Sequence, residues 1–147
     1  MKEDTITKGI IAGLWGTLSD SIVHITSFFI FHTTTTGHYI AKLAFPSKDV
    51  NLPRFGIGET MHFAAGAFAG IFLAYIFKFT GKDHPYLKGI GLGLMMWIVH
   101  VVIIPNLISS PRSIVFRTEL ESIIDLVSHI LFGWAATSYL LKVYEEN

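Results

Sequence analysis

The amino-acid sequence predicts an all-α, polytopic membrane protein folded as a bundle of four transmembrane helices. Hydrophobic residues make up 51% of the 147 residues and charged residues only 15%, and the mean hydropathy is +0.52. Soluble domains carry about a quarter charged residues, so this composition indicates that lipid surrounds much of the chain. Four apolar stretches, each near the roughly 20 residues that a helix needs to cross a bilayer, set the number of spans.

The four predicted spans cover residues 9–31, 60–79, 87–108 and 120–141, within a single membrane domain of residues 1–147. The first apolar stretch is too long for the core of a cleaved signal peptide, so we expect it to be retained as a span. Turn-forming residues separate the later spans, as TGKDHP at 80–85 and SSPR at 109–112. The connection 32–58 is longer and contains Pro46 and Pro53.

The connection 32–58 is expected to lie partly at the membrane interface. Its run of threonines disfavours a helix, so we expect a break near Gly37. Beyond the break, Tyr39, Ile40 and Leu43 favour contact with the membrane surface. The sequence leaves open whether residues 32–52 extend the first span or lie at the interface.

Charge and cysteine content narrow the function classes. An even number of spans places both termini on one side, and a slight excess of lysine on that side predicts cytoplasmic termini in a multi-pass inner or plasma membrane protein. The net charge is zero, so no basic field attracts nucleic acid. The absence of cysteine excludes disulfides and thiolate metal sites. No nucleophile or phosphate-loop motif is present, so catalytic residues are unknown.

Glycines indicate where the helices pack. Gly13 lies in the first span, and Gly66 and Gly70 form a GxxxG pattern in the second. Small residues let transmembrane helices approach closely, which is how helices associate in lipid. These glycines are therefore predicted packing sites, and the same pattern would allow a homo-oligomer.

Ionisable side chains occur in all four spans, although such groups are costly in a bilayer and usually mark sites. They are Asp20, His24, Glu59, His62, His100, Glu121, Asp125 and His129. Residues three or four apart share a helix face, and the alternating direction of the spans places all of these side chains in the half of the membrane away from the termini. The sequence therefore predicts one polar cluster inside the bundle, open towards the non-terminal side.

Pro105 follows His100 by five residues and removes a backbone hydrogen bond from the third span. One interpretation is a helix kink that borders a cavity or site. The alternative is an ordinary helix end, since NLISSP follows.

Three segments of the later spans, MHFAAGAFAG, WIVHVVIIP and ELESIIDLVSHILFGW, together resemble the YagU-like inner-membrane proteins. The resemblance implies site positions at His62, His100, Pro105, Glu121, Asp125 and His129. Asp125 stands where the family pattern has glutamate, and Asp20 and His24 have no counterpart in it. The first span, GIIAGLWGTLSDSIVHITSFF, resembles the start of YqhR-like membrane proteins of spore-forming bacteria. The YagU-like family is linked to acid resistance, which the resemblance extends to this chain as an expectation.

A transition-metal site is the first functional hypothesis, because histidine nitrogen and carboxylate oxygen are ligands for zinc, iron or manganese. Helical bundles use Glu-x-x-His pairs in this way, and Glu59 and His62 have that spacing. The predicted ligands are His62, His100, His129, Glu121 and Asp125. Asp20, His24 and Glu59 would orient these ligands or relay protons.

Three alternatives stay open at this point. Chains of histidine and carboxylate mark proton or cation transport, and histidine would make such a protein respond to acidity. Haem could bind between two histidines, although its iron needs no carboxylates. The groups could also satisfy one another in a purely structural network that fixes helix register.

Overall fold

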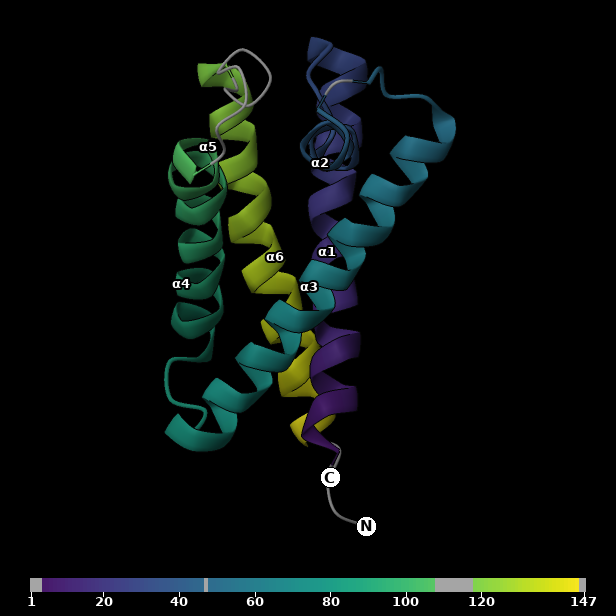
Figure 1. Cartoon of the computed structure of the whole chain (residues 1–147). Coiled ribbons are helices and arrows are strands. Elements are labelled where there is room, and N and C mark those ends of the chain that lie inside the picture. Colours follow the sequence, from purple (N-terminus) through teal and green to yellow (C-terminus); the bar gives the residue numbers. More distant parts are fainter. Residues whose placement is uncertain (1–3, 47, 108–117, 146–147) are drawn as a thin grey trace.

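A computed structural model of the chain describes residues 4–46, 48–107 and 118–145 (Figure 1). Every element in this part of the chain is a helix, which confirms the all-α prediction. The spans are α1 (Thr5–Phe31), α3 (Leu52–Thr80), a third made of α4 (Pro85–Ile98), η1 (Val99–Ile103) and α5 (Ile104–Leu107), and α6 (Glu119–Glu145). All four are long and apolar enough to cross a membrane. The predicted turn 109–112 and residue 108 of the third predicted span lie outside the described residues.

Local capping explains why the first two spans begin earlier than predicted. The Asp4 carboxylate accepts hydrogen bonds from the backbone N–H groups of Ile6 and Thr7, both at 3.1 Å, and so starts α1. Asn51 caps α3 by accepting from the N–H of Arg54 at 3.2 Å. Pro53 therefore lies in the first turn of α3, where its missing N–H costs nothing, rather than in the predicted connection.

A short helix, α2 (Thr36–Ala44), occupies part of the predicted connection. The chain breaks before it, where His32 adopts a left-handed conformation and Thr35 caps the new helix. The predicted break near Gly37 is therefore wrong by a few residues, because threonine acts here as an N-cap. Figure 1 shows α2 nearly end-on, lying across the long helices at the end away from the termini. It packs on α3, where a Cβ added at Gly58 would lie 2.9 Å from the Ala41 nitrogen.

Helix packing follows the glycines. α1 packs against both α3 and α6, and α4 packs against α6, whereas α3 and α4 touch little although they are neighbours in sequence. Gly13, Gly66 and Gly70 all lie at the α1/α3 contact, and Gly93 lies against α6. Because the GxxxG glycines are used within the chain, they give no support to the predicted homo-oligomer, which stays a prediction.

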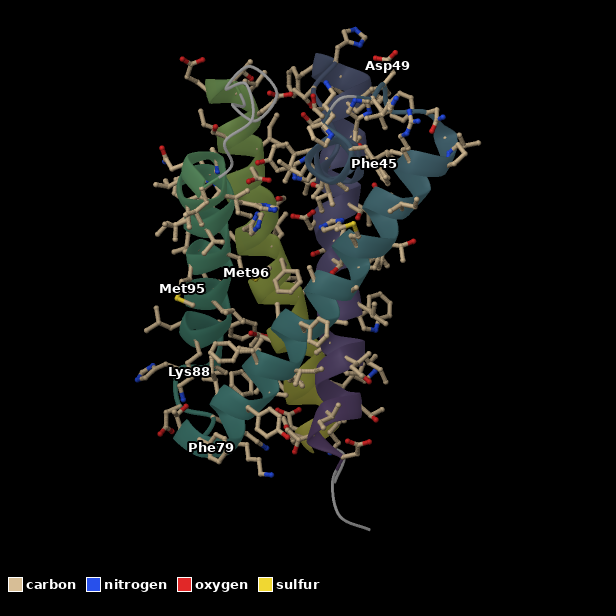
Figure 2. All side chains as sticks on the ribbon, in the orientation of Figure 1. Phe45, Asp49, Phe79, Lys88, Met95 and Met96 are labelled. Atoms are coloured by element: carbon tan, nitrogen blue, oxygen red, sulfur yellow. The ribbon has the colours of Figure 1, made fainter. Side chains whose placement is uncertain are left out.

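The apolar core fills the half of the bundle that holds the termini. Its buried members come from the start of α1 and α4 and from the ends of α3 and α6, and include Ala12, Leu73, Leu92 and Leu140. At that end, the ammonium groups of Lys8 and Lys82 lie 4.8 and 4.7 Å from the Tyr144 ring centroid. Figure 2 shows Phe79 and Lys88 at this end and Phe45 and Asp49 at the other.

The outer surface is apolar as well as the core. Large side chains face outwards along the helices, among them Phe29 and Phe68, each 73% exposed, and Trp15 and Trp134, each 53% exposed. A water-facing surface would not carry such continuous apolar bands, so the outward face is suited to lipid. The protein is therefore a membrane protein.

The α1/α3 contact gives a first prediction. A Cβ at Gly70 would lie 2.5 Å from the Cα of Gly13, so Gly70→Ala must push α1 and α3 apart. We expect a loss of about 2 kcal/mol of unfolding free energy, the usual cost of overpacking, in a denaturant titration in mild detergent. Gly91→Ala is the matched control, because nothing lies within 4 Å of its added Cβ. Equal stability of the two variants would contradict this packing.

Candidate functional site

Two buried aspartates form the centre of the polar half of the bundle. Asp20 lies past the midpoint of α1 and is 2% exposed, and Asp125 lies early in α6 and is fully buried. Because α1 and α6 pack together in opposite directions, these carboxylates meet at the same depth. A carboxylate in such surroundings must be compensated by neighbouring donors or cations.

Histidines from all four spans provide that compensation. Around Asp20, the contacting nitrogens are His62 Nε2 at 3.2 Å, His24 Nε2 at 3.9 Å and His129 Nδ1 at 3.9 Å. Around Asp125 they are His24 Nε2 at 3.4 Å, His100 Nδ1 at 3.9 Å and His129 Nδ1 at 3.9 Å. His24 and His129 thus reach both aspartates and join the two halves into one cluster.

Hydrogen bonds fix two of the imidazole rings. His129 Nδ1 lies 2.8 Å from the main-chain oxygen of Asp125, which can only accept, so Nδ1 donates here and Nε2 is left for another partner. Ser128 donates its hydroxyl to the same oxygen at 3.0 Å and therefore accepts from His24 Nε2 at 3.1 Å. The His129 ring is held as a neutral ligand should be, with its second nitrogen on a backbone carbonyl.

Three of these groups lie close enough to share a metal ion. His100, Asp125 and His129 each offer one ligand atom, and these atoms lie within 4.8 Å of one another. The His100 and His129 rings meet edge to face, with centroids 5.4 Å apart, and Tyr39 of α2 contacts His100 in the same way at 5.7 Å. The set contains two imidazoles and one carboxylate, which suits a transition-metal ion.

A π-helical turn presents His100 to this set. The Ile104 N–H bonds the Val99 carbonyl across the wider turn, and the helix continues through Pro105 to Leu107. The π turn lies directly before Pro105, as the kink interpretation expects, and the described helix ends two residues after the proline, at Leu107. Proline supplies no N–H for the turn before it, which favours this local widening.

Glu121, a predicted ligand, lies elsewhere. Its Oε1 accepts from the Thr34 N–H at 2.9 Å and its Oε2 from the Thr118 N–H at 3.0 Å. The carboxylate therefore caps the start of α6 and ties it to the connection after α1. The four-residue spacing from Glu121 to Asp125 correctly predicts that both lie on one face of α6. Glu121 lies one turn nearer the start of the helix, however, where its carboxylate meets backbone N–H groups instead of the cluster.

The predicted ligand His62 and the predicted relay residue Glu59 lie on the Asp20 side. His62 contacts Asp20, and Glu59 Oε2 lies 3.8 Å from His62 Nδ1. Glu59 keeps 27% of its side chain exposed, so it is the outermost acid of this chain of contacts. His62 is not part of the three-residue group that could share an ion.

The remaining histidines lie outside the cluster. His32 and His84 adopt left-handed conformations at helix ends. His38 lies on α2, where burial, with Lys42 nearby, holds the pKa of its imidazole below the usual range. His38 is therefore neutral at physiological pH and serves as a control residue for the cluster.

A cavity of about 270 Å³ lies beside the cluster. Asp20, His62, His100 and His129 contribute to its wall, together with apolar residues of α3 and of the third span. The exposed members of the wall are Ala65, Met95 and Val99. The mouth therefore lies between α3 and the third span. This corrects the expectation that the cluster opens to the non-terminal side, where α2 lies across the bundle.

The sequence did not assign Ser128 or Tyr39 to the cluster, and Tyr39, expected at the membrane surface, is buried. Ser128 precedes His129 and is fully buried, and its link to His24 arises only when α1 and α6 pack together. Tyr39 reaches His100 because α2 folds back over the bundle. Neither contact has a sequence spacing that could indicate it.

Comparisons with protein-family models, curated proteins and solved structures find no match. The resemblance to YagU-like proteins therefore stays a prediction.

Glu121 gives a second prediction. Glu121→Ala removes the acceptor for the Thr34 and Thr118 N–H groups, so amide exchange in both segments should quicken about fivefold, as expected for losing a cap of about 1 kcal/mol. Hydrogen–deuterium exchange with mass spectrometry measures this. Glu119→Ala, on the exposed first turn of α6, is the control. Unchanged exchange at both segments in Glu121→Ala would contradict the capping role.

Proposed function

We propose that this protein binds one transition-metal ion inside the membrane, with His100, Asp125 and His129 as ligands. The observation that carries the proposal is the approach of two imidazoles and a carboxylate from η1 and α6 to within 4.8 Å. Burial of Asp125 adds to it, because a buried carboxylate is most stable beside a cation. Zinc, iron and manganese all accept this ligand set.

The neighbouring groups suit a supporting role. The Asp20 carboxylate lies 3.9 Å from Nδ1 of the proposed ligand His129. At that distance the carboxylate acts on the ring through its charge, while the Asp125 main-chain oxygen fixes the orientation of the ring. Three protein ligands also leave a coordination position for water or a substrate, as in catalytic rather than structural zinc sites.

Metal analysis of purified protein tests the proposal. We expect about one ion per chain after loading in mild detergent, and at least about a hundredfold weaker binding in His100→Ala, His129→Ala and Asp125→Ala, since loss of an outer-shell partner alone costs about 10- to 100-fold. Affinity should also fall as the pH drops below about 6, because protons compete for the imidazoles.

His38→Ala is the matched control, since His38 lies on α2 outside the cluster. Metal content at background in the wild-type protein would contradict the proposal. An equal loss of metal affinity in His38→Ala and His100→Ala would contradict it as well.

A proton pathway is the second candidate, favoured by the unbroken alternation of acid and imidazole. The contacts run from Glu59 through His62, Asp20, His24 and Asp125 to His100 at 3.2 to 3.9 Å. Such chains carry protons in membrane proteins. The expectation of a role in acid stress, which the YagU-like resemblance implies, agrees with this candidate.

Proteoliposomes with an enclosed pH dye test the pathway. We expect proton entry under an imposed gradient, slowed about tenfold or more by Asp20→Asn, since this change breaks the alternation at its centre. His38→Ala should transport at the wild-type rate. Flux no higher than in empty liposomes would count decisively against the pathway.

A further inference from the structure

The cavity beside the cluster has two chemically different ends. Its mouth and most of its wall are apolar and come from α3 and the third span, with Ala65, Met95, Val99 and Ile104 among them. Its inner end carries the side chains of Asp20, His62, His100 and His129. The mouth lies between two membrane-spanning helices. A lipid-soluble molecule could therefore enter from the bilayer with its polar head group first, so that the head reaches the cluster and the tail stays in the lipid.

The inner end has one acceptor, Asp20 Oδ2, that contacts imidazoles but receives no aligned hydrogen bond from the described residues. Asp20 Oδ2 is buried, and in the part of the chain that the structure describes no donor is aligned with it. His62 Nε2 lies 3.2 Å away and pairs with this oxygen by charge. A buried acceptor without a donor is costly, so a ligand hydroxyl would satisfy it.

Charge argues against an anionic head group. Asp20 places a carboxylate at the inner end, and no lysine or arginine is present among the described residues of the wall. A fatty-acid carboxylate would meet the Asp20 carboxylate with no lysine or arginine beside it. A neutral hydroxyl head avoids this repulsion and supplies the missing donor.

Size limits how much of the ligand enters. The cavity volume corresponds to about nine water molecules, enough for a small head group and the first few carbons of a chain. That volume leaves room for the first carbons of one chain, so a single chain whose remainder stays in the lipid is favoured.

From these observations we propose that the cavity binds a neutral, single-chain lipid with a hydroxyl head, such as a monoacylglycerol or a long-chain alcohol, whose hydroxyl donates to Asp20 Oδ2. This inference goes beyond metal binding and stands whether or not the ion is present. The ligand lies on the Asp20 side of the cluster and needs no metal to hold it.

Photolabelling in phosphatidylcholine nanodiscs tests the proposal, with a monoacylglycerol that carries a diazirine near its head group as the probe. Ala65→Trp fills the mouth and should lower labelling about fivefold or more, since overpacking opposes entry. Ala64→Trp is the matched control: Ala64 is also exposed on α3 but is not part of the cavity wall. Labelled peptides should come from α3 around Ala65 and from the third span around Met95.

Competing ligands, variants of Asp20 and a chelator complete the test. Excess 1-decanol should displace the probe and decanoate should not. Asp20→Asn, which keeps an acceptor oxygen, should retain most of the labelling that Asp20→Leu loses. Labelling should persist in chelator, so that failure of the metal proposal and failure of this one are separable. Equal labelling of the two tryptophan variants, displacement by decanoate, or loss of labelling in chelator would each overturn the proposal.

Discussion

The structure depends on the burial of two carboxylates between apolar helices. An uncompensated ion in such surroundings costs several kcal/mol, so Asp20 and Asp125 persist only because imidazoles surround them. His24 and His129 each contact both aspartates and therefore lock α1 against α6 in one register. The remaining two spans are held to this pair through His62 on one side and His100 on the other.

The two halves of the bundle along the membrane normal are stabilised differently. Its terminal half packs through buried apolar side chains, and glycines let the helix backbones touch. Its other half replaces apolar packing with the histidine–aspartate cluster. Because α3 packs on α1 while α4 packs on α6, the two outer helices diverge and leave the cavity beside the cluster. Packing of the first half thus creates the space that the second half uses.

Much of this arrangement was predictable from spacing alone. Four-residue steps placed Asp20 with His24 and Asp125 with His129, and span direction placed both pairs at one depth. Features set by tertiary contact were not predictable. Glu121 has the same four-residue spacing from Asp125, yet its carboxylate accepts a hydrogen bond from the Thr34 N–H in the chain after α1. The π turn before Pro105 and the fold of α2 over the bundle likewise depend on neighbouring helices rather than on local pattern.

X-ray absorption at the zinc edge of the zinc-loaded protein tests the central claim most directly, namely that histidine and aspartate from η1 and α6 converge on one ion. The account predicts a shell of nitrogen and oxygen at about 2.0–2.1 Å with the multiple-scattering pattern of two imidazoles. His100→Ala should reduce that pattern to one imidazole. A shell of oxygen alone, or a spectrum that His100→Ala leaves unchanged, would contradict the account.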